Sequence, residues 1–85
     1  MTESIREVLR KQARLSVAVE TLESDSNLYL AGMTSHATVN VMLALENEFE
    51  IEFPDVMLRR GVFESIRTIE TAISALCAGN ARLTG

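Results

Sequence analysis

Chain-breaking residues are rare in this sequence and widely spaced. The 85 residues contain a single proline, Pro54, and only the following glycines: Gly32, Gly61, Gly79 and Gly85. Because proline and glycine are the strongest interruptions of regular secondary structure, the segments between them are long enough for helices. Aromatic residues are scarce, with three Phe, one Tyr and no Trp. This pattern favours a small aliphatic helical core over a sheet.

The first segment, residues 3–15, has apolar residues at helical spacing. They fall on one face: Ile5, Val8, Leu9 and Ala13. Thr2 is a suitable N-cap for this helix, because its hydroxyl can accept from an early backbone N–H. Residues 16–34 then show little periodicity, and a loop this long in a small domain suggests a functional role. We expect these side chains to anchor the loop to the core: Leu22, Leu28, Tyr29 and Leu30.

A second helix is predicted from Ser35 to about Glu50, with Ser35 as its N-cap. Its core-facing residues are Val41, Met42, Leu45 and Phe49. Val39 and Leu43 fall on the opposite side, among polar residues. A surface helix needs only one apolar side, so this second side is a candidate for partner contact.

Two further helices are predicted after Pro54. A short one covers residues 56–58 and ends at Gly61, and the last one begins near Thr68 as its N-cap. The last helix carries a stripe typical of packing on a core: Ile69, Ala72, Ile73, Leu76 and Cys77. We expect it to end at a C-cap formed by Gly79 and Asn80.

The sequence therefore predicts an all-α fold, a small four-helix bundle with a long loop between the first two helices and a short third helix. Residues 1–80 are expected to form the domain, and residues 81–85 a disordered tail.

Composition excludes several classes of function. The net charge of −4 and the pI near 4.9 argue against a nucleic-acid partner. No apolar run is long enough to span a membrane, and the N-terminus lacks an apolar signal core, so we expect a soluble cytoplasmic protein. Cys77 is the only cysteine, which excludes an internal disulfide, and we expect its side chain to be buried. No set of residues has the spacing of metal ligands, so no metal site is expected.

The stretch "AGMTSHATVN" places Ser35 beside His36. Neighbouring residues of a helix point about 100° apart, so the two side chains do not form a catalytic pair, and no enzymatic activity is expected. Two interpretations of Ser35 stay open on physical grounds. It only caps the helix, or it carries a phosphate-linked group, which the positive end of a helix would favour.

The stretch "GMTSHATVNVMLALENEFEIEFPD" resembles the central region of acyl carrier proteins, and "FESIRTIETAISAL" is similar to their closing segment. The resemblance spans residues 28–77. It implies that Ser35 is esterified by 4′-phosphopantetheine, which a phosphopantetheinyl transferase supplies from coenzyme A. The thiol of this arm then holds acyl or aminoacyl groups as thioesters, and the protein is a carrier and not an enzyme.

Four positions depart from the usual pattern of that family. Thr34 replaces an aspartate, His36 replaces a leucine, and Asn40 and Asn47 stand where acidic residues are common. The helix is thus less acidic than in a typical fatty-acid carrier, which weakens the case for fatty-acid synthesis enzymes as partners. The sequence looks more like stand-alone aminoacyl carrier proteins of alphaproteobacteria, which are loaded by ligases resembling truncated seryl-tRNA synthetases.

The resemblance implies a monomeric carrier that visits an amino acid:carrier protein ligase or an acyltransferase. We expect its docking face to comprise Thr34, His36, Val39, Asn40, Leu43, Glu46 and Asn47. A conventional fatty-acid, polyketide or peptidyl carrier is the alternative within the family. An unmodified helical interaction module is the alternative from another class.

Overall fold

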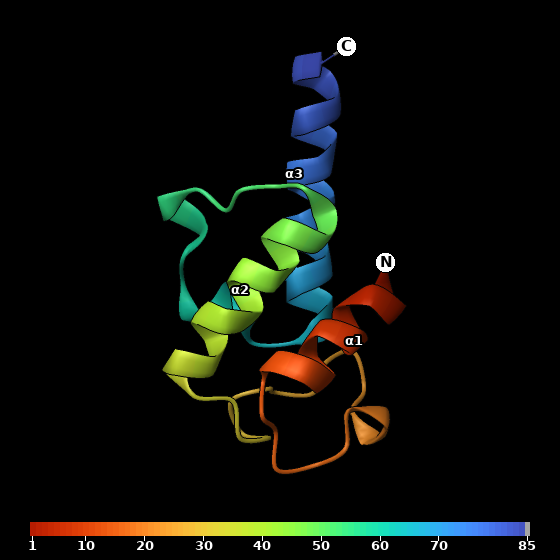
Figure 1. The fold of residues 1–85 in the computed structure, drawn as a ribbon, viewed down its shortest axis with the longest axis vertical. Coiled ribbons are helices and arrows are strands. Elements are labelled where there is room, and N and C mark those ends of the chain that lie inside the picture. The colour runs from red at the N-terminus through yellow and green to blue at the C-terminus, as the bar shows by residue number, and fades with distance from the viewer. Residues whose placement is uncertain (85) are drawn as a thin grey trace.

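The computed structural model describes the backbone of residues 1–84, and the side chains as far as Ala78. The α-helices are α1 (Thr2–Gln12), α2 (Ser35–Phe49) and α3 (Ile66–Thr84), and the 3₁₀ helices are η1 (Val19–Thr21), η2 (Asp55–Met57) and η3 (Arg60–Phe63). No strand occurs within residues 1–84. α1 packs against both α2 and α3, and α3 also contacts η3 (Figure 1). The all-α prediction is confirmed, but a four-helix bundle is not.

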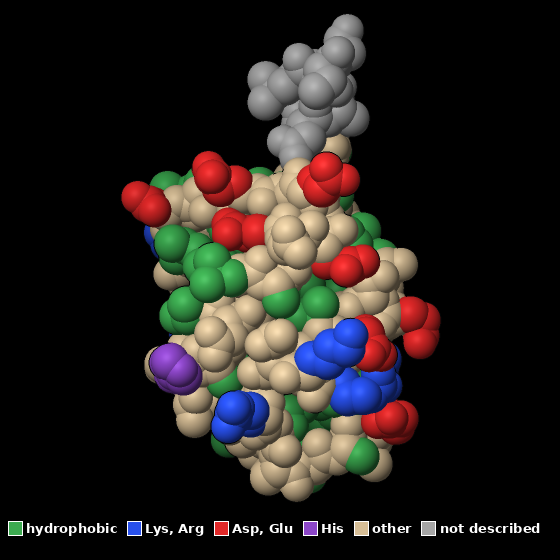
Figure 2. All heavy atoms as spheres, in the orientation of Figure 1, with side chains coloured by type: hydrophobic (Ala, Val, Ile, Leu, Met, Phe, Trp, Pro, Cys, Tyr) green, Lys and Arg blue, Asp and Glu red, His purple; other side chains and the backbone are tan. Residues whose placement is uncertain are grey.

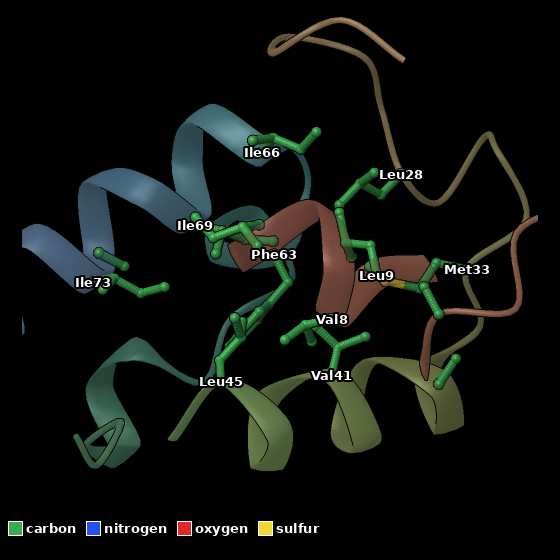
Figure 3. Close-up of a cluster of buried hydrophobic side chains, with 14 of the residues drawn as sticks. Val8, Leu9, Leu28, Met33, Val41, Leu45, Phe63, Ile66, Ile69 and Ile73 are labelled. Carbon is green, nitrogen blue, oxygen red and sulfur yellow. The ribbon is translucent and has the colours of Figure 1, made fainter. Parts of the chain in front are cut away.

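The core lies where α1, α2 and α3 meet (Figure 3). Its largest fully buried side chains are Ile5, Leu9, Leu28, Val41, Leu45, Ile66, Ile69 and Ile73. The rings of Phe53 and Phe63 pack edge to face, with centroids 5.2 Å apart. Cys77 is only partly buried against this core. The core-facing sides predicted for the three long helices thus form one contiguous apolar cluster.

The first helix is shorter than predicted. α1 ends at Gln12 instead of residue 15, because Arg14 adopts a left-handed backbone with φ of 53°, which no α-helix accommodates. Thr2 is not the N-cap: Met1 holds that position, and the Thr2 hydroxyl donates to the carboxylate of Glu70 in α3. The predicted capping role of Thr2 is therefore wrong, and its side chain links the two helices instead.

Arg6 holds the first part of the long loop against α1. Its guanidinium donates to the carbonyl oxygens of Val19 at 2.9 Å and Leu22 at 3.0 Å. Within η1, the pKa of Glu20 is lowered by a hydrogen bond from its own backbone N–H and by the charge of Arg10. The loop is thus fixed by polar contacts as well as by apolar anchors.

The second part of the loop is fixed to the start of α3. The N–H of Leu28 donates to the Glu64 carbonyl at 2.7 Å, and the N–H of Arg67 donates to the Ser24 carbonyl at 3.0 Å. Leu28 is fully buried, as predicted, and Tyr29 and Leu22 pack partly against the core. Leu30 is 86% exposed, so its predicted role as an anchor is wrong.

The segment between α2 and α3 contains no α-helix. The predicted short helix at residues 56–58 is replaced by η2 and η3. Two residues interrupt it: Leu58 leaves the helical region (ψ 61°), and Arg59 is extended (ψ 150°). Gly61 lies inside η3, so it does not end the preceding turn as predicted. This irregular segment forms one side of the candidate site.

The last helix starts earlier and ends later than predicted. Its cap is Ser65, whose hydroxyl accepts from the N–H of Thr68 at 3.2 Å, while the Thr68 hydroxyl accepts from the N–H of Ser65 at 3.0 Å. Thr68 is therefore not the N-cap but its reciprocal partner. α3 continues to Thr84, past the predicted C-cap at Gly79 and Asn80, which is wrong.

The side chains of residues 79–84, and all of residue 85, lie outside the described residues. The boundary between the domain and a tail at residues 80 and 81 stays a prediction. Along the described part of the chain, no helix has both the length and the apolar character needed to cross a membrane.

Candidate functional site

Thr34 occupies the N-cap position of α2. Its backbone is extended (φ −88°, ψ 168°), and its hydroxyl accepts a hydrogen bond from the N–H of Ala37 at 3.0 Å. The prediction that Ser35 caps this helix is wrong, because Ser35 is already the first helical residue. An aspartate at position 34 could accept the same bond, so threonine preserves the local structure at this departure from the carrier pattern.

The Ser35 side chain is exposed and does not cap α2. None of the hydrogen bonds found among the described residues involves its hydroxyl, and the N–H of Ala37 is bonded to Thr34 instead. His36 is also exposed, and its position one residue along the helix turns it away from Ser35. The Ser35 hydroxyl is therefore accessible to a modifying protein and lacks a neighbouring base on its own helix.

The turn that precedes α2 is fixed by a close approach between Gly32 and Ser16. Gly32 has φ of 116°, and a Cβ at this position would lie 2.9 Å from the backbone nitrogen of Ser16. Both the N–H and the hydroxyl of Ser16 donate to the Ala31 carbonyl at 2.8 Å. Glycine is thus required here on both conformational and steric grounds. This contact connects the end of α1 to the turn that presents Ser35.

A surface hollow of about 290 Å³ lies beside Ser35. It lies between α2 and the segment that carries η2 and η3. Its lining residues are Tyr29, Ser35, Thr38, Val39, Met42, Leu58, Arg59, Arg60 and Phe63. The guanidinium of Arg60 stacks on the Tyr29 ring, 3.8 Å from the centroid. Ser35 therefore lines a hollow with largely apolar walls, to which Arg59 and Arg60 also contribute.

The outward side of α2 presents the predicted apolar residues to solvent. Val39 is 50% exposed and Leu43 is 53% exposed. Figure 2 shows hydrophobic side chains gathered on the edge of the molecule that carries the histidine, with acidic side chains above them. Among the other residues of the predicted docking face, Thr34, His36 and Asn47 are exposed and Asn40 is partly buried.

The residues of the predicted face lie at successive turns of α2, but they do not all line the hollow beside Ser35. Val39 lines the hollow beside Ser35, whereas Asn47 lines a separate hollow against α1. Glu46 is occupied within the chain, because its carboxylate accepts from the N–H of Phe53 at 2.8 Å. Glu46 thus holds the segment after α2, which the sequence assignment to a docking surface did not anticipate.

Sequence reasoning missed the opposite wall of the hollow. Leu58, which lines the hollow, is 46% exposed, and Arg59 and Arg60 follow it directly. The sequence signal for this wall is the run "VMLRRG", which places apolar and basic residues side by side in an acidic chain. Within the described residues, no group of three or more His, Cys, Asp or Glu side chains could hold a metal ion.

Residues 3–76 match the family described as the phosphopantetheine attachment site. This chain belongs to that family. The match covers nearly all of α1, the long loop, the turn that presents Ser35, all of α2 and the first part of α3. The arrangement fits a covalent phosphate ester, because the family's group needs an accessible hydroxyl and Ser35 has one with no competing hydrogen bond.

One relative indicates which kind of carrier protein this chain is related to. The chain is 42% identical to an aminoacyl carrier protein of Agrobacterium fabrum, over 93% of this chain and 95% of the relative. This carrier is therefore a homologue of aminoacyl carrier proteins, as the sequence resemblance predicted.

Solved structures show the same fold. One is the Agrobacterium tumefaciens carrier protein in a crystal structure with an engineered Bradyrhizobium japonicum glycine:carrier protein ligase and AMP. It is 43% identical, with a TM-score of 0.85 over 87% of this chain and 99% of that one. A second is the glycylated carrier protein in complex with the Bradyrhizobium japonicum ligase. It is 27% identical, with a TM-score of 0.72 over 84% of this chain and 95% of that one.

Proposed function

We propose that this protein carries an aminoacyl group on a 4′-phosphopantetheine arm attached to Ser35. The observation that carries the proposal is the separation of roles at the start of α2, where Thr34 makes the cap and leaves the Ser35 hydroxyl accessible. When bound, the arm supplies a terminal thiol that holds the aminoacyl group as a thioester. An unmodified interaction module would have no need for this division between the two hydroxyls.

The protein itself fixes the position of the attachment point. The Gly32 turn and the Thr34 cap fix the position of the Ser35 oxygen relative to α2. A tethered cargo then reaches a docked enzyme at a high effective concentration, without any catalytic group on the carrier. Recognition is expected to come from α2 and from the wall of the hollow that faces it.

An amino acid:carrier protein ligase is the proposed loading partner, and a phosphopantetheinyl transferase is the proposed modifying partner. Support for the ligase comes from the relatives, which form complexes with a glycine:carrier protein ligase. The exposed Val39 and Leu43 supply apolar contact area for such partners. We propose that the carrier is monomeric and cytoplasmic. A monomer can visit the transferase and the ligase in turn, and the reducing cytoplasm keeps the arm's thiol reduced.

A loading experiment tests which group the arm carries. The arm-bearing protein is incubated with ATP, a glycine:carrier protein ligase and single amino acids, and separately with malonyl-coenzyme A and a malonyl transferase. Intact mass measures the thioester formed. We expect aminoacylation by a small amino acid and little malonylation. Efficient malonylation without aminoacylation would identify a conventional fatty-acid or polyketide carrier and would contradict the proposal.

A further inference from the structure

The turn that precedes Ser35 is tied to a distant part of the sequence through Ser16. Both the N–H and the hydroxyl of Ser16 donate to the carbonyl of Ala31 at 2.8 Å. Every other hydrogen bond found for residues 29–34, within the described part of the chain, has its partner among residues 27–38. Ser16 therefore supplies the hydrogen bonds that hold this turn from outside.

The bonds from Ser16 act on a part of the turn that the core does not hold. Leu28 and Met33 are buried and fix the two ends of the turn. Gly32, between them, is exposed. Because two donors of Ser16 meet the same oxygen, they limit the rotation of the peptide group that joins Ala31 to Gly32.

Both sides of this contact have unusual backbone conformations. Gly32 has φ of 116°, and a Cβ there would lie 2.9 Å from the nitrogen and 3.2 Å from the hydroxyl oxygen of Ser16. Arg14, two residues before Ser16, has φ of 53°, a left-handed conformation that costs free energy in a residue other than glycine. Strain of this kind persists where the surrounding structure holds it, and it gathers at functional sites. The contact is thus a specific feature of the fold.

We infer that Ser16 is a positioning residue for the transfer of the arm to Ser35. The inference rests on the proposed attachment at Ser35. The turn leads into Thr34, whose extended backbone and hydrogen bond set where α2 begins. Because Ser35 is the first residue of α2, a turn that pivots also moves the Ser35 oxygen relative to a docked transferase. Val39 lies a full helical turn further along, so binding of the transferase should change less than the transfer step.

The transfer step depends on the position of this oxygen. The Ser35 oxygen forms a bond to the phosphorus of the phosphopantetheine group. The bond between that phosphorus and the 3′,5′-adenosine bisphosphate part of coenzyme A breaks, and the Ser35 hydroxyl proton is released. A misplacement of about 1 Å can slow a step of this kind about 100-fold. A looser turn should therefore lower kcat and leave the KM for the carrier nearly unchanged.

Thr21 offers a matched control within the same long loop. Its N–H and its hydroxyl both donate to the carbonyl of Ala18, at 3.0 and 2.6 Å, so it repeats the pattern of Ser16 away from the turn. Ser16→Ala and Thr21→Ala each remove one hydroxyl and keep the N–H, so neither carbonyl loses its last donor. We expect both variants to fold as the parent does, which circular dichroism and thermal unfolding check.

The experiment measures the rate of attachment to the parent and both variants, with coenzyme A and a broad-specificity phosphopantetheinyl transferase. We expect Ser16→Ala to lower kcat about tenfold at an unchanged KM for the carrier, and Thr21→Ala to match the parent. Hydrogen exchange of the unmodified proteins gives a readout that does not depend on the transferase. The amides of Gly32 and Met33 should exchange faster in Ser16→Ala and not in Thr21→Ala.

Three results would overturn the inference. The first is a kcat in Ser16→Ala equal to that of the parent. The second is an equal loss of kcat in both variants, which would reflect a general loosening of the loop. The third is a rise in KM alone, which would make Ser16 a contact residue for the transferase. An absence of attachment in the parent would instead refute the proposed function.

Discussion

The hydroxyl of Thr34 accepts a hydrogen bond from the N–H of Ala37 at 3.0 Å, so the cap of α2 does not depend on the hydroxyl of Ser35. Because Thr34 satisfies the start of α2, the Ser35 hydroxyl is free for chemistry. We propose different roles for the two adjacent hydroxyls, and substitutions can distinguish them.

Capping provides the first prediction. Thr34→Ala should lower the free energy of unfolding by about 1 kcal/mol, because it removes the N-cap acceptor. Thr34→Asp should retain stability, since a carboxylate accepts the same bond and favours the positive end of the helix. Ser35→Ala should change the stability of the unmodified protein by less than about 0.5 kcal/mol. Urea denaturation measures all three. An equal loss in Ser35→Ala would contradict the assignment of the cap.

The turn before α2 provides the second prediction. Gly32→Ala should destabilise the fold by about 1–3 kcal/mol, because a Cβ at φ of 116° is strained and would displace Ser16. Gly61→Ala is the matched control, since a Cβ added there would have nothing within 4 Å, and it should stay within about 0.5 kcal/mol of the parent. Similar losses in both variants, by chemical denaturation, would disprove the role of the Gly32 contact.

Glu46 provides the third prediction. Glu46→Ala should cost about 1–3 kcal/mol, because the N–H of Phe53 loses its charged acceptor. Glu46→Gln keeps an acceptor oxygen and should cost less. Glu48→Ala, at an exposed position of the same helix, should stay within about 0.5 kcal/mol. An unchanged stability in Glu46→Ala would contradict the role of this bond in holding the segment after α2.

The outward side of α2 provides the fourth prediction. Val39→Asp and Leu43→Asp should slow loading by the ligase while changing the unfolding free energy by less than about 1 kcal/mol, because both side chains are half exposed. Leu45→Ala, in the core, should instead cost about 2–5 kcal/mol. Loading kinetics and circular dichroism separate the two effects. Loss of helical content in the aspartate variants would mean that these residues support the fold.

The sequence predicted the parts of the fold that depend on helical periodicity. Val41 and Leu45 lie one helical turn apart, and both are fully buried in α2. Capping was harder to assign, because Thr34 and Ser35 are both good N-caps and only the extended backbone of Thr34 decides between them. Likewise Thr68 and Ser65 form a reciprocal cap whose direction the sequence alone does not give.

The hollow could not be predicted, because its far wall is an irregular segment. Leu58 and Arg59 adopt backbone angles that depend on tertiary contacts and not on local periodicity. The pairing of Arg60 with Tyr29 joins residues far apart in the chain. Similarly, the bond between Glu46 and Phe53 follows from the path of the chain after α2. In contrast, the identity of Ser35 as the candidate attachment point followed from its motif.

Attachment of the arm is the central claim, and intact mass spectrometry tests it most directly. The purified protein is incubated with coenzyme A and a broad-specificity phosphopantetheinyl transferase, alongside Ser35→Ala and Thr34→Ser. The account predicts an increase by one phosphopantetheine group in the parent and in Thr34→Ser, and no increase in Ser35→Ala. An unchanged mass in the parent, or an increase that persists in Ser35→Ala, would contradict it.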